Sequence, residues 1–265
     1  MPWRENRSPY RVFVSEIMLQ QTSVAMVIPR YRAFLKAFPS FRSLAAASVQ
    51  EVVQAWKGLG YNRRALALLQ SARIIRSVHR GRLPRTVEGL VRLPGVGNAT
   101  AAAVIVYAFN IPLAFTETNI RRVFIHFFFP GEDKVPDSRI LPLVEQTLDR
   151  KNPREWFYAL MDYGAFLGAR KAPEDALRRS SRYRRQGAFE GSHRQLRGRI
   201  LQVMLEKKRA GLPAIEGALG KDPRLAKALD ELASEGFLSF ERGRYSFKQL
   251  SSSRWSVTPS GSRPR

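Results

Sequence analysis

The chain has 265 residues, enough for two domains, and its 45 Lys and Arg against 22 Asp and Glu give a formal net charge of +23, which favours a polyanionic partner such as nucleic acid. Cysteine is absent and the three histidines lack metal-ligand spacing, so the sequence excludes disulfides, thiol catalysis, iron–sulfur clusters and Cys-based zinc sites, and we expect no metal centre. Neither a run of eighteen apolar residues nor a secretory signal occurs, so we expect a cytoplasmic, nucleoid-associated protein without a membrane partner.

Helical periodicity dominates the chain up to about residue 168. Tyr10, Val14, Ile17 and Met18 recur at helical spacing with Gln21 on the same stripe. A second apolar stripe runs from Ala65 to Ile75. We expect prolines to separate the helices at Pro29, Pro39, Pro84, Pro94, Pro112 and Pro136. Because few segments alternate with period two, the sequence predicts an all-α fold here.

A glycine hairpin is predicted at Leu93-Pro94-Gly95-Val96-Gly97. Its glycines permit a tight turn with positive φ, and a run of small residues that begins at Asn98 continues it as a helix. The backbone amides at that helix start face outward and suit a DNA phosphate. The alternative is a turn with no ligand.

A carboxylate at the start of another helix is predicted at Glu117-Thr118-Asn119. The helix dipole there favours the ionised form of an acid. A phosphate site beside an ionised acid is what an enzyme acting on a nucleotide requires. The alternative is that Glu117 only stabilises the helix start.

The character of the chain changes at residues 170–193, where arginines crowd a segment with little apolar content. This segment is either a solvated linker or an arm that contacts phosphates, and the net charge favours DNA contact. The basic residues of its first part are Arg170, Lys171, Arg178, Arg179, Arg182, Arg184 and Arg185.

Residues 194–248 are predicted to form a second, small domain. Helical spacing runs through Leu196, Ile200 and Met204, and two further helices are expected near 213–219 and 223–235. Alternation around Gly243 then predicts a hairpin. Three helices and a hairpin resemble a winged helix-turn-helix, a fold that binds DNA in many proteins and other proteins elsewhere. Residues 249–265, rich in Ser and Arg, are expected to be disordered.

Several strings in residues 2–168 together resemble the helix-hairpin-helix DNA glycosylases of the endonuclease III and MutY superfamily, with the MutY adenine glycosylase branch closest. The most specific string is Glu16-Ile17-Met18-Leu19-Gln20-Gln21-Thr22. The others are Pro2-Trp3-Arg4, Gly58-Leu59-Gly60-Tyr61, the glycine hairpin and Asn119. The resemblance implies a two-lobed, all-α glycosylase domain over residues 1–169.

The resemblance assigns Glu16 as the general acid that protonates the departing adenine. Breaking a glycosidic bond passes through an oxocarbenium-like state, and a carboxyl in an apolar pocket keeps its proton near neutrality. The family's second carboxylate, an aspartate, stabilises the sugar cation. Its position here holds Glu117, one methylene longer, with Asn119 as its orienting partner. We expect the pocket to have adapted to the glutamate; a different substrate, or loss of excision, are the alternatives.

The position of the Schiff-base lysine in bifunctional relatives corresponds to Ala99, so the resemblance implies a monofunctional enzyme. Gln20, Gln21 and Tyr61 match residues that wedge into duplex DNA around the flipped base. The hairpin, through Gly95, Val96, Gly97 and Asn98, is expected to hold a phosphate and to offer its carbonyls to a monovalent cation.

Two departures from the family limit this reading. The Arg-rich segment takes the place of the cluster cysteines that the branch carries. The predicted winged helix takes the place of the C-terminal domain with which that branch reads 8-oxoguanine. We therefore expect a monomer without an iron–sulfur cluster that removes a base, most simply mismatched adenine, from double-stranded DNA. The alternatives are a glycosylase for uracil, thymine or an alkylated purine, and a lesion-binding protein without catalysis.

Overall fold

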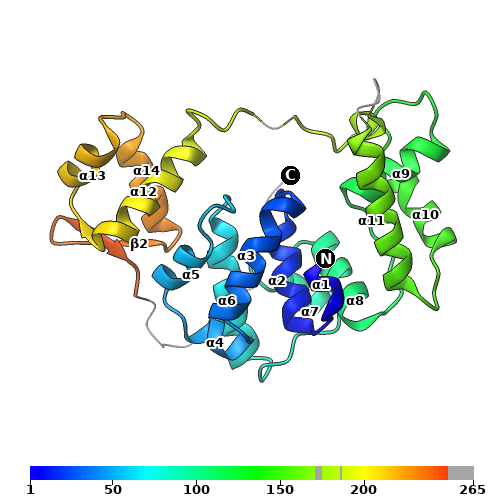
Figure 1. Ribbon diagram of the computed structural model, residues 1–265, viewed down its shortest axis with the longest axis horizontal. Coiled ribbons are helices and arrows are strands. Elements are labelled where there is room, and N and C mark those ends of the chain that lie inside the picture. Colours follow the sequence, from blue (N-terminus) through cyan, green and yellow to red (C-terminus); the bar gives the residue numbers. More distant parts are fainter. Residues whose placement is uncertain (171–174, 186, 250–265) are drawn as a thin grey trace.

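The computed structural model describes residues 1–170, 175–185 and 187–249. The all-α prediction is confirmed: the first 169 residues are built of helices joined by turns (Figure 1). These helices are α1 (Pro2–Glu5), α2 (Pro9–Leu19), α3 (Val24–Ala37), α4 (Phe41–Ala46), α5 (Val49–Ala55), α6 (Arg63–Ser77), α7 (Val87–Val91), α8 (Asn98–Phe109), α9 (Thr118–Phe128), α10 (Asp137–Thr147) and α11 (Pro153–Ala169). None of the helices in the described ranges is long and apolar enough to cross a membrane.

The helices pack around two separate apolar cores. One core joins α2 to α7 with one side of α8, and its largest fully buried side chains include Phe13, Tyr31, Phe34 and Trp56. The other joins the opposite side of α8 with α9, α10 and α11. Figure 1 shows α9 to α11 set apart at one end of the molecule. Because α8 contributes to both cores and α2 packs along it, these two helices form the junction between the lobes.

Local signals explain where several helices begin and end. Ser8 and Ser48 accept backbone N–H groups at the starts of α2 and α5, and Glu51 completes a capping box on α5. Glu117 caps α9 in the same way. Asn110 ends α8 in the left-handed conformation that asparagine tolerates.

Two helix predictions were wrong in detail. Pro29 lies inside α3 rather than between helices, and the Arg30 guanidinium donates to the Met26 carbonyl in the turn that the proline disturbs. Gln21 does not continue the stripe of α2, because that helix ends at Leu19 and Gln21 has a φ of 57°.

Much of the Arg-rich segment is bound to the protein itself. A short 3-10 helix, η1 (Ala176–Arg179), packs on α9. The Arg179 guanidinium donates to the carbonyl of Phe129, and Arg182 pairs with Asp137 at 3.7 Å. DNA contact by this segment stays a prediction; Lys171 lies outside the described residues.

The C-terminal module, residues 193–248, contains three helices and a small sheet. The helices are α12 (His193–Lys207), α13 (Leu212–Leu219) and α14 (Leu225–Ser234). The predicted hairpin is β2 (Leu238–Glu241) with β3 (Arg244–Phe247), paired antiparallel so that Phe240 faces Tyr245 across the strands. A strand that the sequence analysis missed, β1 (Arg209–Ala210), pairs with β3. At two residues it is too short to show alternation. The winged-helix assignment stays a prediction, and the predicted disorder of the tail falls, from residue 250 on, outside the described residues.

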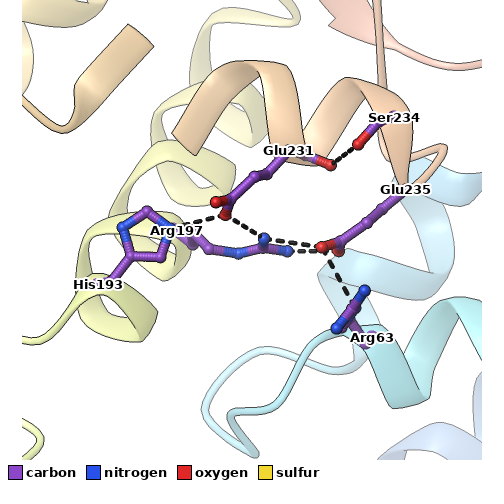
Figure 2. A network of polar contacts seen from close by, with 6 residues as sticks. All are labelled: Arg63, His193, Arg197, Glu231, Ser234 and Glu235. Atoms are coloured by element: carbon purple, nitrogen blue, oxygen red, sulfur yellow. Dashed lines mark hydrogen bonds and ion pairs between the residues drawn. The ribbon is translucent and has the colours of Figure 1, made fainter. Parts of the chain in front are cut away.

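The C-terminal module is docked on the first lobe. Its apolar residues belong to the same core as α2 to α7, and α12 packs against α5. A chain of charged contacts joins α12 to α14, and one of its pairs crosses the junction (Figure 2): Arg63 of α6 pairs with Glu235, which pairs with Arg197 at 2.5 Å. Arg197 also contacts Glu231, which accepts from His193 at 2.7 Å. The junction therefore combines apolar burial with the ion pair from Arg63.

Candidate active site

A cavity of about 340 Å³ opens where the two lobes meet. It is lined by residues from α1, α2, the start of α9 and one face of α11, together with Tyr107 of α8. The volume falls in the range of small-molecule sites. Glu16 lines it together with Glu117 and Asn119, which follow more than a hundred positions later in the chain.

Glu16 lies on α2 among buried neighbours. Ser15 and Ile17 are each 1% exposed and Val14 is fully buried, whereas Glu16 itself is half-buried and lines the cavity. Burial raises the pKa of Glu16 to about 8, the negative charge of Glu117 adds to the rise, and Arg4 opposes it. Glu16 is therefore protonated at neutral pH.

Glu117 sits at the N-cap of α9, as the sequence predicted. One carboxylate oxygen accepts from the backbone N–H of Asn119 at 2.5 Å and from that of Ile120 at 2.8 Å. Burial nevertheless raises the pKa of Glu117 above its usual value, while these amides and the charge of Arg121 lower it. The helix start therefore offsets only part of the cost of burial, a correction to the expectation drawn from the dipole alone.

Asn119 orients Glu117 through its backbone, and not through its side chain. The side-chain carbonyl oxygen accepts from Arg122 at 2.9 Å instead. Arg122 also donates to the carbonyl of Gly164 on α11 and pairs with Asp175. A Cβ at Gly164 would lie 2.5 Å from the Asn119 carbonyl oxygen, so only glycine lets α11 approach the start of α9 this closely. This contact fixes the start of α9, which Glu117 caps, against α11.

Among the cavity residues that were not singled out as site residues from the sequence are Arg4, Asp162, Tyr107 and Tyr158. Arg4 makes a bidentate pair with Asp162, at 2.7 and 2.8 Å, and lies 4.3 Å from the centre of the Tyr158 ring. The pair joins α1 to α11 across the cavity wall. Arg4 belongs to a string that carried the resemblance, but nothing in its local sequence shows that it faces Asp162.

The hairpin has the conformation that its sequence predicted. Gly95 has a φ of 76°, and Gly97 is the N-cap of α8, where no side chain caps the first turn. Two side chains fix the loop: Gln20 donates to the Gly95 carbonyl at 3.2 Å, and Ser71 to that of Pro94 at 3.1 Å. Asn98 is exposed at the first position of α8. The uncapped helix start thus remains available to an anion.

The loop before α6 presents Tyr61. Gly58, Gly60 and Tyr61 all have positive φ, and the Tyr61 side chain is 38% exposed. Beneath the loop, buried Arg64 donates to the carbonyls of Leu59 and Gly60 and to that of Met18 at the end of α2. One guanidinium therefore holds the Tyr61 loop and the Gln20–Gln21 turn together, which places the predicted wedge residues on neighbouring loops.

The residues that the structure describes give no support for a metal or cluster site. The iron–sulfur cluster of the resembling branch does not fit, because the sequence has no cysteine. Over the described ranges, no group of three or more His, Asp or Glu side chains could hold a metal ion. Ala99 is exposed on α8, and no lysine is among the described residues that line the cavity.

Comparisons with known proteins agree with this arrangement. A family model described as HhH-GPD superfamily base excision DNA repair protein matches residues 14–142. An adenine DNA glycosylase of Mycolicibacterium smegmatis is 32% identical over 257 residues, covering 90% of this chain and 87% of the relative. The structure of a thermostable thymine-DNA glycosylase aligns with a TM-score of 0.55 at 28% identity, over 62% of this chain and 77% of that one.

The length of the match differs between relatives. An adenine DNA glycosylase of Buchnera aphidicola is 32% identical over 175 residues, 66% of this chain but only 50% of the relative, so the chain spans about half of that protein. The mycobacterial match covers 90% of the chain and so extends beyond residues 2–168, to which the sequence analysis confined the resemblance.

Proposed function

The chain belongs to the HhH-GPD superfamily of base excision DNA repair proteins, and on that premise we propose that it hydrolyses the glycosidic bond of a base flipped out of duplex DNA, most simply mismatched adenine. One observation carries the proposal. Glu16, with its pKa raised to about 8, faces the same cavity as Glu117, whose oxygen is held by the start of α9.

The two carboxyls suit the two halves of the reaction. Glu16 donates its proton to N7 of the base, which makes the base a better leaving group. The bond from C1′ to the base breaks, and ionised Glu117 stabilises the positive sugar. Water then adds to C1′ and gives its proton to the carboxyl pair, leaving an abasic site. Glu117 ionises before Glu16 because backbone amides offset part of the rise in its pKa, whereas Glu16 has no such donor among the described contacts.

The absence of an amine near the sugar supports monofunctional chemistry. A lyase step needs a lysine to form a Schiff base with C1′. Position 99 holds alanine, and lysine is missing from the described lining of the cavity. On this proposal the enzyme leaves the DNA backbone intact. We further propose that it acts as a monomer without an iron–sulfur cluster and works in the cytoplasm on nucleoid DNA.

The Arg4–Asp162 pair supports adenine as the base. Adenine has an exocyclic amine that donates and ring nitrogens that accept. Asp162 lines the cavity and retains acceptor capacity beyond the two hydrogen bonds from Arg4. An acceptor on the cavity wall matches the exocyclic amine of that edge.

The test is single-turnover excision on duplexes carrying A opposite 8-oxoguanine, A opposite G, U opposite G, T opposite G, or undamaged pairs. Alkali converts abasic sites to strand breaks. We expect product from an adenine duplex only after alkali, and none from Glu16→Gln although that variant binds the same duplex. Product from another duplex alone would change the substrate. Binding without product on every duplex would favour the non-catalytic alternative.

A further inference from the structure

Tyr107 is held rigidly in the cavity wall. It lies on α8 and is 4% exposed. Its ring stacks on Tyr158 at 4.9 Å with an interplanar angle of 11°, and meets Phe115 edge to face at 6.2 Å. Its backbone carbonyl accepts from Arg154 at 2.7 Å. Packing on two sides therefore fixes where the hydroxyl points.

The hydroxyl of Tyr107 has no partner within the described part of the protein, although it is buried. Other buried tyrosines of the first lobe satisfy theirs: Tyr10 donates to the Phe38 carbonyl and Tyr31 to that of Arg11. A buried polar group without a hydrogen bond lowers stability, and folded proteins rarely retain one without a reason. Tyr107 lines the cavity with Glu16 and Glu117, so a bound molecule can supply the missing partner.

Burial and the neighbouring carboxylates keep the Tyr107 hydroxyl protonated. Burial raises its pKa well above the usual value, and Glu16 and Glu117 raise it further while Arg4 opposes them. The phenol therefore remains a hydrogen-bond donor throughout the pH range in which the carboxyls titrate.

We propose that the Tyr107 hydroxyl donates a hydrogen bond to the nucleotide bound in the cavity and so positions its glycosidic bond between Glu16 and Glu117. This inference rests on the proposed function. Tyr107 neither gives up its proton nor joins the bond-breaking step. It adds a fixed donor to the cavity wall that also carries Glu16 and Glu117.

The experiment compares the whole protein with Tyr107→Phe, which keeps the ring and removes only the oxygen. It measures single-turnover excision from an A:8-oxoguanine duplex, binding of a duplex carrying 2′-fluoro-2′-deoxyadenosine, whose glycosidic bond resists cleavage, and thermal stability. We expect excision to fall about tenfold or more, since a desolvated donor is lost. The fluorinated duplex should bind several-fold more weakly, and the melting temperature should stay the same or rise, because an unpaired hydroxyl is removed.

Tyr10→Phe is the matched control, because it removes a buried and paired hydroxyl away from the cavity. It should lower the melting temperature and leave excision by the folded protein unchanged. Wild-type excision and binding in Tyr107→Phe would overturn the inference, as would a loss of rate that only follows a loss of stability. If the wild-type protein excises no base, the proposed function fails. The role of the hydroxyl is then judged separately, and binding of the fluorinated duplex that is unchanged in Tyr107→Phe would reject it.

Discussion

At the scale of single residues, the site depends on two glutamates in different surroundings. Both are enclosed by the lobes, but backbone amides reach only Glu117. Glu16 thus keeps its proton to higher pH, which separates the donor from the cation-stabilising carboxylate. The extra methylene of Glu117, compared with the family's aspartate, is accommodated because its oxygen is fixed by α9 and the start of α9 is fixed by Gly164.

The raised pKa of Glu16 predicts how stability depends on pH. A carboxyl whose pKa is about 8 when folded and about 4.5 when unfolded stabilises the protein fully below pH 4.5 and loses that contribution as pH rises towards 8. Glu16→Gln does not titrate. We expect the unfolding free energy of the variant, measured by urea denaturation at pH 9, to exceed that of the wild type by about 1 kcal/mol or more. This difference should shrink towards pH 5.

Glu155→Gln, at an exposed glutamate on α11, is the control for this comparison. A pH-independent difference between wild type and Glu16→Gln would show that Glu16 is not held in a desolvated site.

The length of the second carboxylate gives another prediction. Glu117→Asp restores the family residue but draws the carboxylate back by one methylene from a pocket built around glutamate. A displacement of about 1 Å in a reacting group can cost on the order of a hundredfold in rate. We expect slower single-turnover excision with the DNA affinity retained. An equal or faster rate would show that the pocket has not adapted to Glu117.

At the scale of elements, the glycine hairpin is the part whose conformation was most predictable. Gly95 occupies the left-handed region, and a Cβ there would lie 2.8 Å from that of Ala67. At Gly97, φ is −93° and a Cβ would meet nothing within 4 Å. We expect Gly95→Ala to lower the unfolding free energy by about 1–3 kcal/mol and Gly97→Ala to change it little, as measured by denaturant unfolding.

The same elements show what the sequence could and could not predict. The hairpin, the cap at Glu117 and the periodic helices depend on neighbours in the chain, so the local sequence predicts them. The Arg4–Asp162 pair and the stack of Tyr107 on Tyr158 depend on how α1, α8 and α11 pack, and no local signal encodes that. The side-chain partner of Asn119 was missed although it is local, because Arg122 lies three positions further along the same helix.

At the scale of the whole molecule, the C-terminal module touches the predicted wedge. Arg194 of α12 donates to the Tyr61 hydroxyl at 3.1 Å and to the Gly187 carbonyl at 2.6 Å. The charged chain of Figure 2 and the shared apolar core hold α12 in that place. The module thus supports the loop that presents Tyr61 and is not a free appendage.

This docking predicts that Arg194→Ala weakens binding to a duplex with an unpaired or mismatched base several-fold, because Tyr61 loses a restraint. Arg199→Ala, on the same helix but bonded to the Leu219 carbonyl, is the control with equal loss of charge. Affinity is compared at two salt concentrations, since a general phosphate contact changes the salt dependence. Equal effects of both substitutions would show that Arg194 contributes to binding only through its charge and not through its contact with Tyr61.

The central claim is that protonated Glu16 starts the excision of a base. It is tested most directly by the single-turnover rate on saturating adenine-mismatch duplex from pH 6 to pH 9.5. The rate should fall tenfold per pH unit above about pH 8, as the carboxyl loses its proton, and excision should be absent in Glu16→Gln at every pH. A rate that stays level across pH 8, or wild-type excision in Glu16→Gln, would contradict the account.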